Sequence, residues 1–158
     1  MTESINLLME QLILQKILEG RNVFIVGSTD SGKSYFIKNK VIPLLEHNNI
    51  KVSYFKDCES LKLDKQCDVY IVDEVEILFD KIFLENKYPK ESPYFTKNYL
   101  EKVKKWHKKL SRINKPVICV VTRNTEDEID YLSKNYKSLE WNNLPVDVIR
   151  FQNYKTNN

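Results

Sequence analysis

The segment Gly27–Ser34, with the sequence GSTDSGKS, holds residues whose types and spacing suit phosphate chemistry. The chain has three glycines in 158 residues, and two of them, Gly27 and Gly32, lie in this segment. Glycines let a backbone wrap an anion with successive N–H groups pointing inward, and a following helix presents its positive N-terminal end to that anion. The pattern G-x-x-x-x-G-K-S predicts that Lys33 meets the β and γ phosphates of a nucleotide and that Ser34 binds Mg²⁺. The residues predicted to bind the nucleotide, taken to be ATP, are Gly27, Ser28, Thr29, Asp30, Ser31, Gly32, Lys33, Ser34 and Tyr35.

Two acidic residues close a second apolar run, DVYIVDE at Asp68–Glu74. Asp73 stands where a carboxylate can hold Mg²⁺ through its hydration shell. Glu74 follows directly, and a second carboxylate there can orient and deprotonate an attacking water. The pair is interpreted as a metal ligand and a catalytic base. A strand that simply ends in solvated acids is the alternative.

A third polar cluster follows the apolar run Pro116–Thr122. Ligands of parallel sheets lie at the carboxyl ends of the strands, so Thr122 and Asn124 are expected near the γ-phosphate or the attacking water. Arg123 stands between them and is the best internal candidate for an arginine finger, acting within the chain or across a subunit contact. Strand ends are often polar without a ligand, so an ordinary strand end is the alternative.

The elements that must position these residues are predicted from hydrophobic periodicity. Strands are predicted at Asn22–Gly27, Ile50–Phe55, Asp68–Glu74, Pro116–Thr122 and Val146–Phe151. Helices are predicted at residues 4–20, Ser34–His47, 75–84, Tyr99–Asn114 and Glu126–Tyr136, with Pro43 kinking the second or starting a new turn. Strands that alternate with helices indicate an α/β fold with parallel pairing and right-handed crossovers.

Composition and length limit the domain organisation and the class of protein. An amphipathic helix at residues 1–20 is expected to pack on one domain at residues 21–152, followed by a frayed tail at 153–158. Hydrophobic residues make up 42% and charged residues 30%, and the net charge of +3 permits a nucleic-acid partner without requiring one. The three cysteines have no disulfide or metal spacing, which favours reduced thiols and a cytoplasmic protein. Polar residues interrupt the apolar segment 4–20, and a membrane-spanning helix needs about 20 apolar residues, so no membrane association is expected.

The motifs GSTDSGKS, VYIVDE and VICVVTRN, in this order and spacing, resemble the ASCE division of the P-loop NTPases over residues 22–151. The resemblance implies a three-layer α/β fold, with a five-stranded, mostly parallel sheet of order 5-1-4-3-2 and helices on both faces. It implies the following roles: phosphate binding by Lys33, Mg²⁺ binding by Ser34 and Asp73, base catalysis by Glu74, and sensing by Thr122 or Asn124. GTPases are disfavoured because Glu76 stands where they carry a glycine.

Two departures from that division affect the expected activity. AAA-type ATPases carry a helical lid with a sensor arginine after the fifth strand, and only residues 152–158 follow Phe151, so no such lid is expected. The arginines of the sequence are Arg21, Arg112, Arg123 and Arg150. We therefore expect slow turnover by a monomer, and a homo-oligomer or a partner protein that completes the site.

Three functions remain open from the sequence. The first is an Mg²⁺-dependent ATPase that couples hydrolysis to a nucleic-acid or assembly transaction; the loop also resembles those of DNA-pumping ATPases. The second is a small kinase of the polynucleotide or nucleotide type, in which Asp57 would be the acceptor base. The third is a nucleotide-gated interaction module with little hydrolysis. The residues predicted to contact DNA or RNA are Lys102, Lys105, Lys109 and Arg112, although a solvated lysine-rich face is the alternative.

Overall fold

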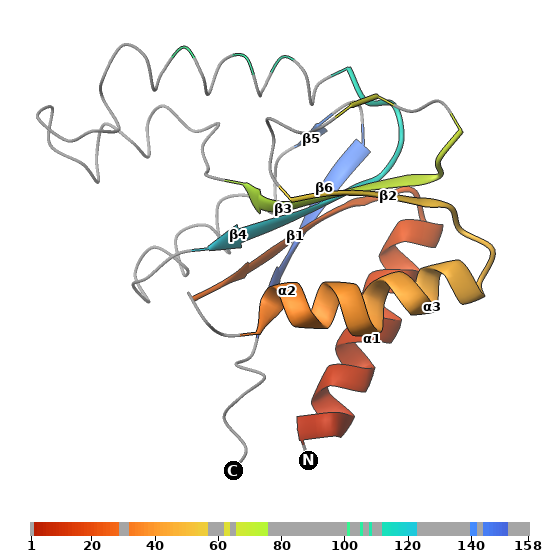
Figure 1. Cartoon of the computed structure of the whole chain (residues 1–158), viewed down its shortest axis with the longest axis vertical. Coiled ribbons are helices and arrows are strands. Elements are labelled where there is room, and N and C mark those ends of the chain that lie inside the picture. The colour runs from red at the N-terminus through yellow and green to blue at the C-terminus, as the bar shows by residue number, and fades with distance from the viewer. Residues whose placement is uncertain are drawn as a thin grey trace, which may run out of the picture.

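The computed structural model describes residues 2–28, 32–56, 62–63, 66–75, 101, 105, 108, 112–122, 140–141 and 144–151. In this part of the chain a twisted sheet is flanked by helices (Figure 1). The helices are α1 (Thr2–Leu18), α2 (Lys33–Phe36), the π-helix η1 (Ile37–Val41) and α3 (Ile42–His47). The strands are β1 (Asn22–Gly27), β2 (Val52–Phe55), β3 (Val69–Val75), β4 (Val117–Thr122), β5 (Glu140–Trp141) and β6 (Leu144–Arg150).

The strand order of the sheet is β2-β3-β4-β1-β6-β5. The first five strands in this order pair in parallel, and the two-residue strand β5 pairs antiparallel with β6. The parallel part has the predicted order 5-1-4-3-2, because β6 is the fifth strand of the prediction. The α/β fold and its sheet topology are thus confirmed, whereas β5 was not predicted, since two residues are too few to show an alternating pattern.

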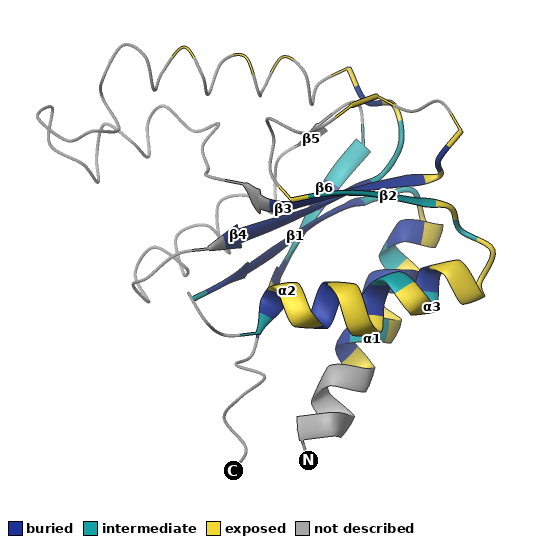
Figure 2. Ribbon diagram, in the orientation of Figure 1, coloured by how far each residue is buried: buried dark blue, intermediate teal, exposed yellow. Residues whose placement is uncertain are grey.

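Strand β1 lies at the centre of the sheet and is buried along its whole length (Figure 2). It pairs with β4 on one side and β6 on the other. Strands covered on both faces are continuously apolar rather than alternating. This explains why the run NVFIVG has an uninterrupted apolar core. Because Gly27 is the last residue of β1, it lies at the carboxyl edge of the sheet.

Helices α2, η1 and α3 form the single helical stretch from Lys33 to His47 that the sequence predicts for Ser34–His47. Pro43 lies in the first turn of α3. Just before it, the N–H of Ile42 donates to the carbonyl of Ile37, five residues back. Proline lacks an N–H and clashes with the carbonyl four residues earlier, so a wider turn relieves the strain. The predicted disturbance at Pro43 is therefore a π turn rather than a break.

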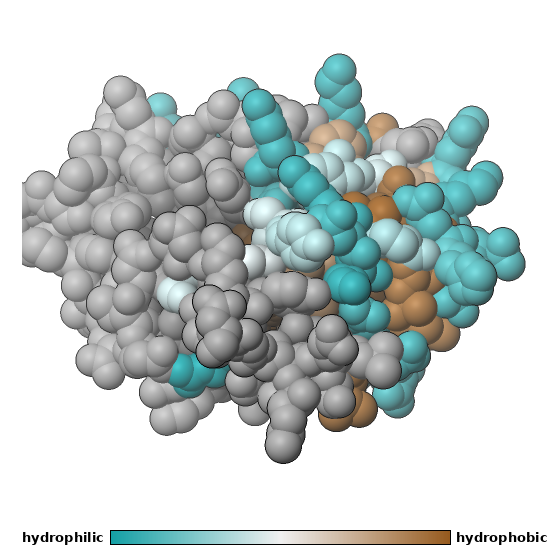
Figure 3. All heavy atoms as spheres, turned by 60° about the horizontal axis from the view of Figure 1, so that its bottom comes forward, coloured by the Kyte–Doolittle hydropathy of each residue, from teal (hydrophilic) through white to brown (hydrophobic). Residues whose placement is uncertain are grey.

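Helix α1 packs on the same core as the α2–α3 stretch. Its buried residues are Met9, Ile13, Leu14 and Ile17. Gly20, with φ of +76°, follows its last turn and has the left-handed conformation in which glycine commonly ends a helix. Leu8 and Leu18 are 70% and 67% exposed, so the outer side of α1 is less polar than an amphipathic helix requires. Figure 3, viewed from below Figure 1, shows apolar atoms exposed among polar ones.

The structure changes the boundaries of two other helices that the sequence predicts. Val75 ends β3, so the helix predicted for 75–84 does not begin there, and the rest of that range lies outside the described residues. Positions 101, 105 and 108 are helical, but Arg112 lies in a turn and Ile113 is not helical, so the helix predicted to end at Asn114 ends earlier. The helix predicted at Glu126–Tyr136 and the tail 153–158 lie outside the described residues. None of the described helices is long and apolar enough to cross a membrane.

Candidate functional site

The two glycines of the GSTDSGKS segment mark the two sides of one loop. Gly27 is the last residue of the central strand β1, and Gly32 directly precedes α2. Gly32 has φ of 93° and ψ of 15°, a left-handed conformation that residues with a Cβ adopt only at a cost. Its carbonyl accepts from the N–H of Phe36 at 2.9 Å and so starts the helix. The strand–loop–helix arrangement required by the motif is present.

Gly27 stands at a position where a side chain would be crowded. A Cβ at this position would lie 3.2 Å from Cδ of Lys33 and 3.2 Å from Cβ of Phe151. The N–H of Phe151 donates to the carbonyl of Val26 at 2.8 Å, which holds this residue against the end of β1. From the sequence, Phe151 is predicted only as part of the last strand, and its hydrogen bond to the end of β1 is not apparent.

The side chain of Lys33 folds back toward the loop. Lys33 is 5% exposed, and its Nζ donates to the carbonyl of Ser28. A buried ammonium group must be hydrogen-bonded, and here the loop backbone accepts from it. The next two residues, Ser34 and Tyr35, are exposed. The other residues of the predicted nucleotide site, Thr29 to Ser31, lie outside the described residues.

Asp73 is a buried carboxylate with one unsatisfied oxygen. It is 4% exposed, and its Oδ2 accepts from the hydroxyl of Tyr54 at 2.7 Å. Its Oδ1 has no hydrogen-bond partner in the described structure. Buried polar atoms without a partner are rare in proteins and often mark the place of an ion or a water. A carboxylate oxygen is also the ligand that Mg²⁺ prefers, so Asp73 fits a metal-binding role.

The backbone of β3 is irregular at the two candidate carboxylates. Val72 pairs with Cys119 of β4, but the next pair joins Val75 to Val121. Two residues of β3, Asp73 and Glu74, thus stand opposite one residue of β4. A bulge of this kind bends a strand and re-aims its side chains, and bulges are common next to active sites. The sequence VYIVDEV has no feature that would reveal the bulge, because it arises from the pairing with β4.

The strand ends predicted to surround the nucleotide meet at one edge of the sheet. Thr122, the last residue of β4, pairs with Gly27 in the parallel register. Its backbone therefore lies beside the start of the loop, and its role as a sensor stays a prediction. Arg123, Asn124 and Asp57 lie outside the described residues.

The opposite end of β1 is held by polar contacts. The guanidinium of Arg21 donates to both carboxylate oxygens of Asp147, and this hydrogen bonding raises the pKa of Arg21 above its ordinary value. Buried Asn22 joins three strands, since its Oδ1 accepts from the N–H of Val117 at 3.0 Å and its Nδ2 donates to the carbonyl of Leu144 at 3.4 Å. Arg21 thus lies at the end of the sheet away from Gly27.

The remaining described arginines lie at different ends of the sheet. Arg112 is exposed and precedes β4, so it lies at the end away from the loop. Arg150 is exposed at the carboxyl end of β6 and pairs with Val26, one residue before Gly27. Arg150 is therefore nearer to the loop along the sheet than Arg112, which the sequence did not reveal.

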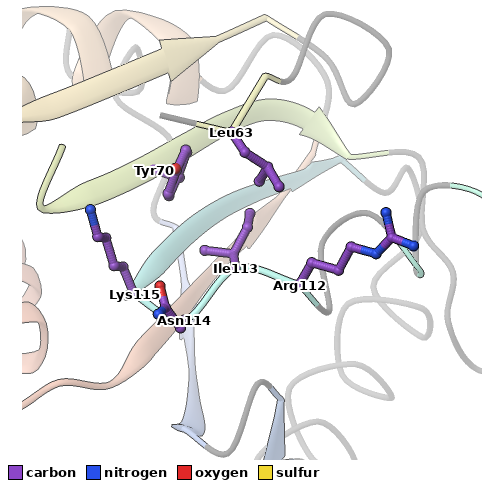
Figure 4. A pocket seen from close by; sticks show the side chains of 6 residues that line it. All are labelled: Leu63, Tyr70, Arg112, Ile113, Asn114 and Lys115. Atoms are coloured by element: carbon purple, nitrogen blue, oxygen red, sulfur yellow. The ribbon is translucent and has the colours of Figure 1, made fainter. Parts of the chain in front are cut away.

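A cavity of about 350 Å³ opens at the amino ends of β3 and β4 (Figure 4). Its lining residues are Leu63, Tyr70, Arg112, Ile113, Asn114 and Lys115. It lies at the end of the strands opposite to Gly27. The Nζ of Lys115 donates a hydrogen bond to the carbonyl of Cys67. This cavity is separate from the candidate phosphate loop.

A scan against protein-family models finds no match, and a search of curated proteins finds none either. The structure supports an α/β protein with a five-stranded parallel sheet and gives no family assignment. The function must then be argued from the site itself, since a fold alone does not determine it.

Proposed function

We propose that this chain binds ATP with Mg²⁺ and hydrolyses ATP as an ASCE-type P-loop ATPase. The observation that supports this most is the position of Lys33. Its ammonium group reaches back to the carbonyl of Ser28, inside a loop that joins the central strand to a helix N-terminus. A phosphate chain in this loop would meet the positive end of α2 and the Lys33 charge together.

The residues that would hold Mg²⁺ are Ser34 and Asp73. Among the described residues, no group of three or more His, Cys, Asp or Glu side chains could form a metal cage. Mg²⁺ does not need one, because it commonly takes one or two protein ligands together with substrate phosphates and waters. The unsatisfied Oδ1 of Asp73 fits such a ligand. Bound Mg²⁺ would neutralise charge on the β and γ phosphates.

Two further positions of the chain are assigned to the reaction. Glu74 follows Asp73 in the bulge of β3, where its carboxylate would orient a water and accept its proton. Thr122 lies beside Gly27 at the sheet edge and would sense the γ-phosphate, together with Asn124. The reaction transfers the γ-phosphoryl group from ATP to water, with ADP as the leaving group.

The process that ATP hydrolysis would drive is proposed from the exposed basic residues of the chain. Exposed basic residues at positions 105, 108 and 112 support a nucleic-acid or assembly transaction in the cytoplasm. The kinase alternative depends on Asp57, and the described residues contribute no observation in its favour. A nucleotide-gated module would bind ATP through the same loop and differ in turnover alone.

Calorimetric titration with ATP and Mg²⁺ tests the binding site. Lys33→Ala removes the charge that meets the phosphates, so we expect binding to be lost while the thermal unfolding curve remains cooperative. Lys40→Ala, at an exposed position in the same helical stretch, is the matched control and should bind like the wild type. Equal affinity of the Lys33→Ala variant and the wild type would reject the proposed site.

A further inference from the structure

Tyr54 of β2 contacts the candidate metal ligand Asp73 on the neighbouring strand β3. It pairs with Ile71 in the parallel register of β2 and β3, and Asp73 lies two residues further along β3. A diagonal neighbour at this spacing is within reach of a long aromatic side chain. The hydroxyl of Tyr54 donates to Oδ2 of Asp73 at 2.7 Å, a short distance typical of a hydrogen bond to a carboxylate.

The ring of Tyr54 is also contacted from the helix that follows the loop. The Nζ of Lys38, in η1, lies 5.3 Å from the centre of the ring. This distance is within the range of a cation–π interaction. Tyr54 is half-buried, so the ring is held between the helical stretch after the loop and the strand that carries Asp73. A side chain held on both sides can fix the orientation of a neighbour.

The hydrogen bond from Tyr54 divides the two oxygens of Asp73 into different roles. Oδ2 is occupied by the hydroxyl, whereas Oδ1 is buried and has no partner in the described structure. The hydroxyl supplies one proton, so it can engage one oxygen and leave the other as the free acceptor. Without it, the carboxylate could rotate or exchange the roles of its two oxygens.

We infer that Tyr54 is a positioning residue for the metal ligand Asp73, and that it holds Oδ1 toward the cation that accompanies the nucleotide. This inference rests on the proposed ATP·Mg²⁺ function. Partners that hydrogen-bond to metal-binding carboxylates fix their geometry, and their loss typically weakens metal affinity about 10- to 100-fold. Tyr54 therefore supports the Mg²⁺-dependent part of nucleotide binding and has no effect on the Mg²⁺-independent part.

The test measures ATP affinity by calorimetry in excess MgCl₂ and again in excess EDTA. The ratio of the two dissociation constants, EDTA over Mg²⁺, isolates the contribution of the metal. Tyr54→Phe keeps the ring and removes the hydroxyl, so the ratio should fall about tenfold while the affinity in EDTA stays unchanged. Tyr70→Phe removes a hydroxyl from a buried residue of β3 at the cavity end of the strand, and its ratio should equal that of the wild type.

A double-mutant comparison separates positioning from a general structural effect. Asp73→Asn should lower the ratio at least as much as Tyr54→Phe does. If Tyr54 acts through Asp73, adding Tyr54→Phe to Asp73→Asn should lower the ratio no further. Additive losses would contradict the inference.

The two proposals fail in distinguishable ways. A wild-type protein that binds no ATP would overturn both. If the wild type binds ATP with a Mg²⁺ dependence that Asp73→Asn removes but Tyr54→Phe does not, the ATP site stands and the role of Tyr54 is rejected. Should Tyr54→Phe fail to fold, Lys38→Met removes only the charge over the ring. A smaller fall in the ratio would then support the inference, and an unchanged ratio would overturn it.

Discussion

The ring of Phe151 packs against the ring of Phe36, with centres 5.2 Å apart and planes inclined at 55°. Phe151 follows β6, and Phe36 ends α2, the helix that opens after the loop. Both side chains are buried. The contact thus fixes the helix N-terminus relative to the end of the sheet, where the proposed nucleotide would bind.

Phe151→Ala should therefore destabilise the fold as well as the site. Truncating a buried phenylalanine costs about 3–5 kcal/mol, because transfer free energy is lost and a cavity remains. Urea denaturation measures this change in the free energy of unfolding. Phe55→Ala, at a half-buried position of the edge strand β2, should cost less. A smaller loss for Phe151 than for Phe55 would show that the aromatic contact contributes little.

Gly27→Ala and Gly20→Ala separate the need for space from the need for a left-handed backbone. A Cβ at Gly27 would crowd Lys33 and Phe151, whereas at Gly20 nothing lies within 4 Å but φ is +76°. Crowding of this kind typically costs about 1–3 kcal/mol, and a left-handed non-glycine residue about 1–2 kcal/mol.

We expect both variants to lose stability and only Gly27→Ala to weaken ATP binding, since only that substitution displaces the Lys33 side chain. Calorimetry beside thermal denaturation checks both effects. Normal ATP affinity in Gly27→Ala would mean that the crowded atoms move aside without disturbing the loop.

The parts of this structure that were predictable from sequence are those set by local residue types. A left-handed glycine before a helix and a buried apolar strand before a loop follow from GSTDSGKS and NVFIVG alone. The strand order was predicted from the resemblance that these motifs carry. The contacts of Tyr54 with Asp73, and of Phe151 with Phe36, join residues far apart in the sequence, and their side chains could equally have served the core. The bulge at Asp73 depends on pairing with β4, which no single strand encodes.

Glu74→Gln separates nucleotide binding from chemistry. Glutamine keeps the size of the side chain and cannot accept a proton, so ATP affinity should stay unchanged. Hydrolysis should fall about 10²-fold or more, as the loss of a general base predicts. Phosphate release under single-turnover conditions measures the chemical step. Hydrolysis at the wild-type rate would show that Glu74 is not the base and would weaken the assignment to ASCE-type chemistry.

Turnover should depend on protein concentration, because in the proposed reaction Lys33 and Mg²⁺ would stabilise only part of the charge that develops on the transferred phosphoryl group. An arginine finger can add about 10³–10⁵ in rate. Among the described arginines, Arg21 is engaged by Asp147 at the far end of β1, and Arg112 precedes β4 at that same end. Arg150 lies beside Val26, at the loop end of the sheet. Arg123 follows directly on Thr122, which pairs with Gly27.

We therefore expect specific activity to rise with protein concentration, in parallel with assembly measured by analytical ultracentrifugation. Arg123→Ala should remove this rise and leave ATP affinity unchanged, and Arg150→Ala is the comparison at the neighbouring strand end. A monomer with fast turnover that stays constant on dilution would refute the need for a second subunit. If the rise persists in Arg123→Ala but disappears in Arg150→Ala, the finger is Arg150. If neither variant removes it, the accelerating group is not an arginine of these strand ends.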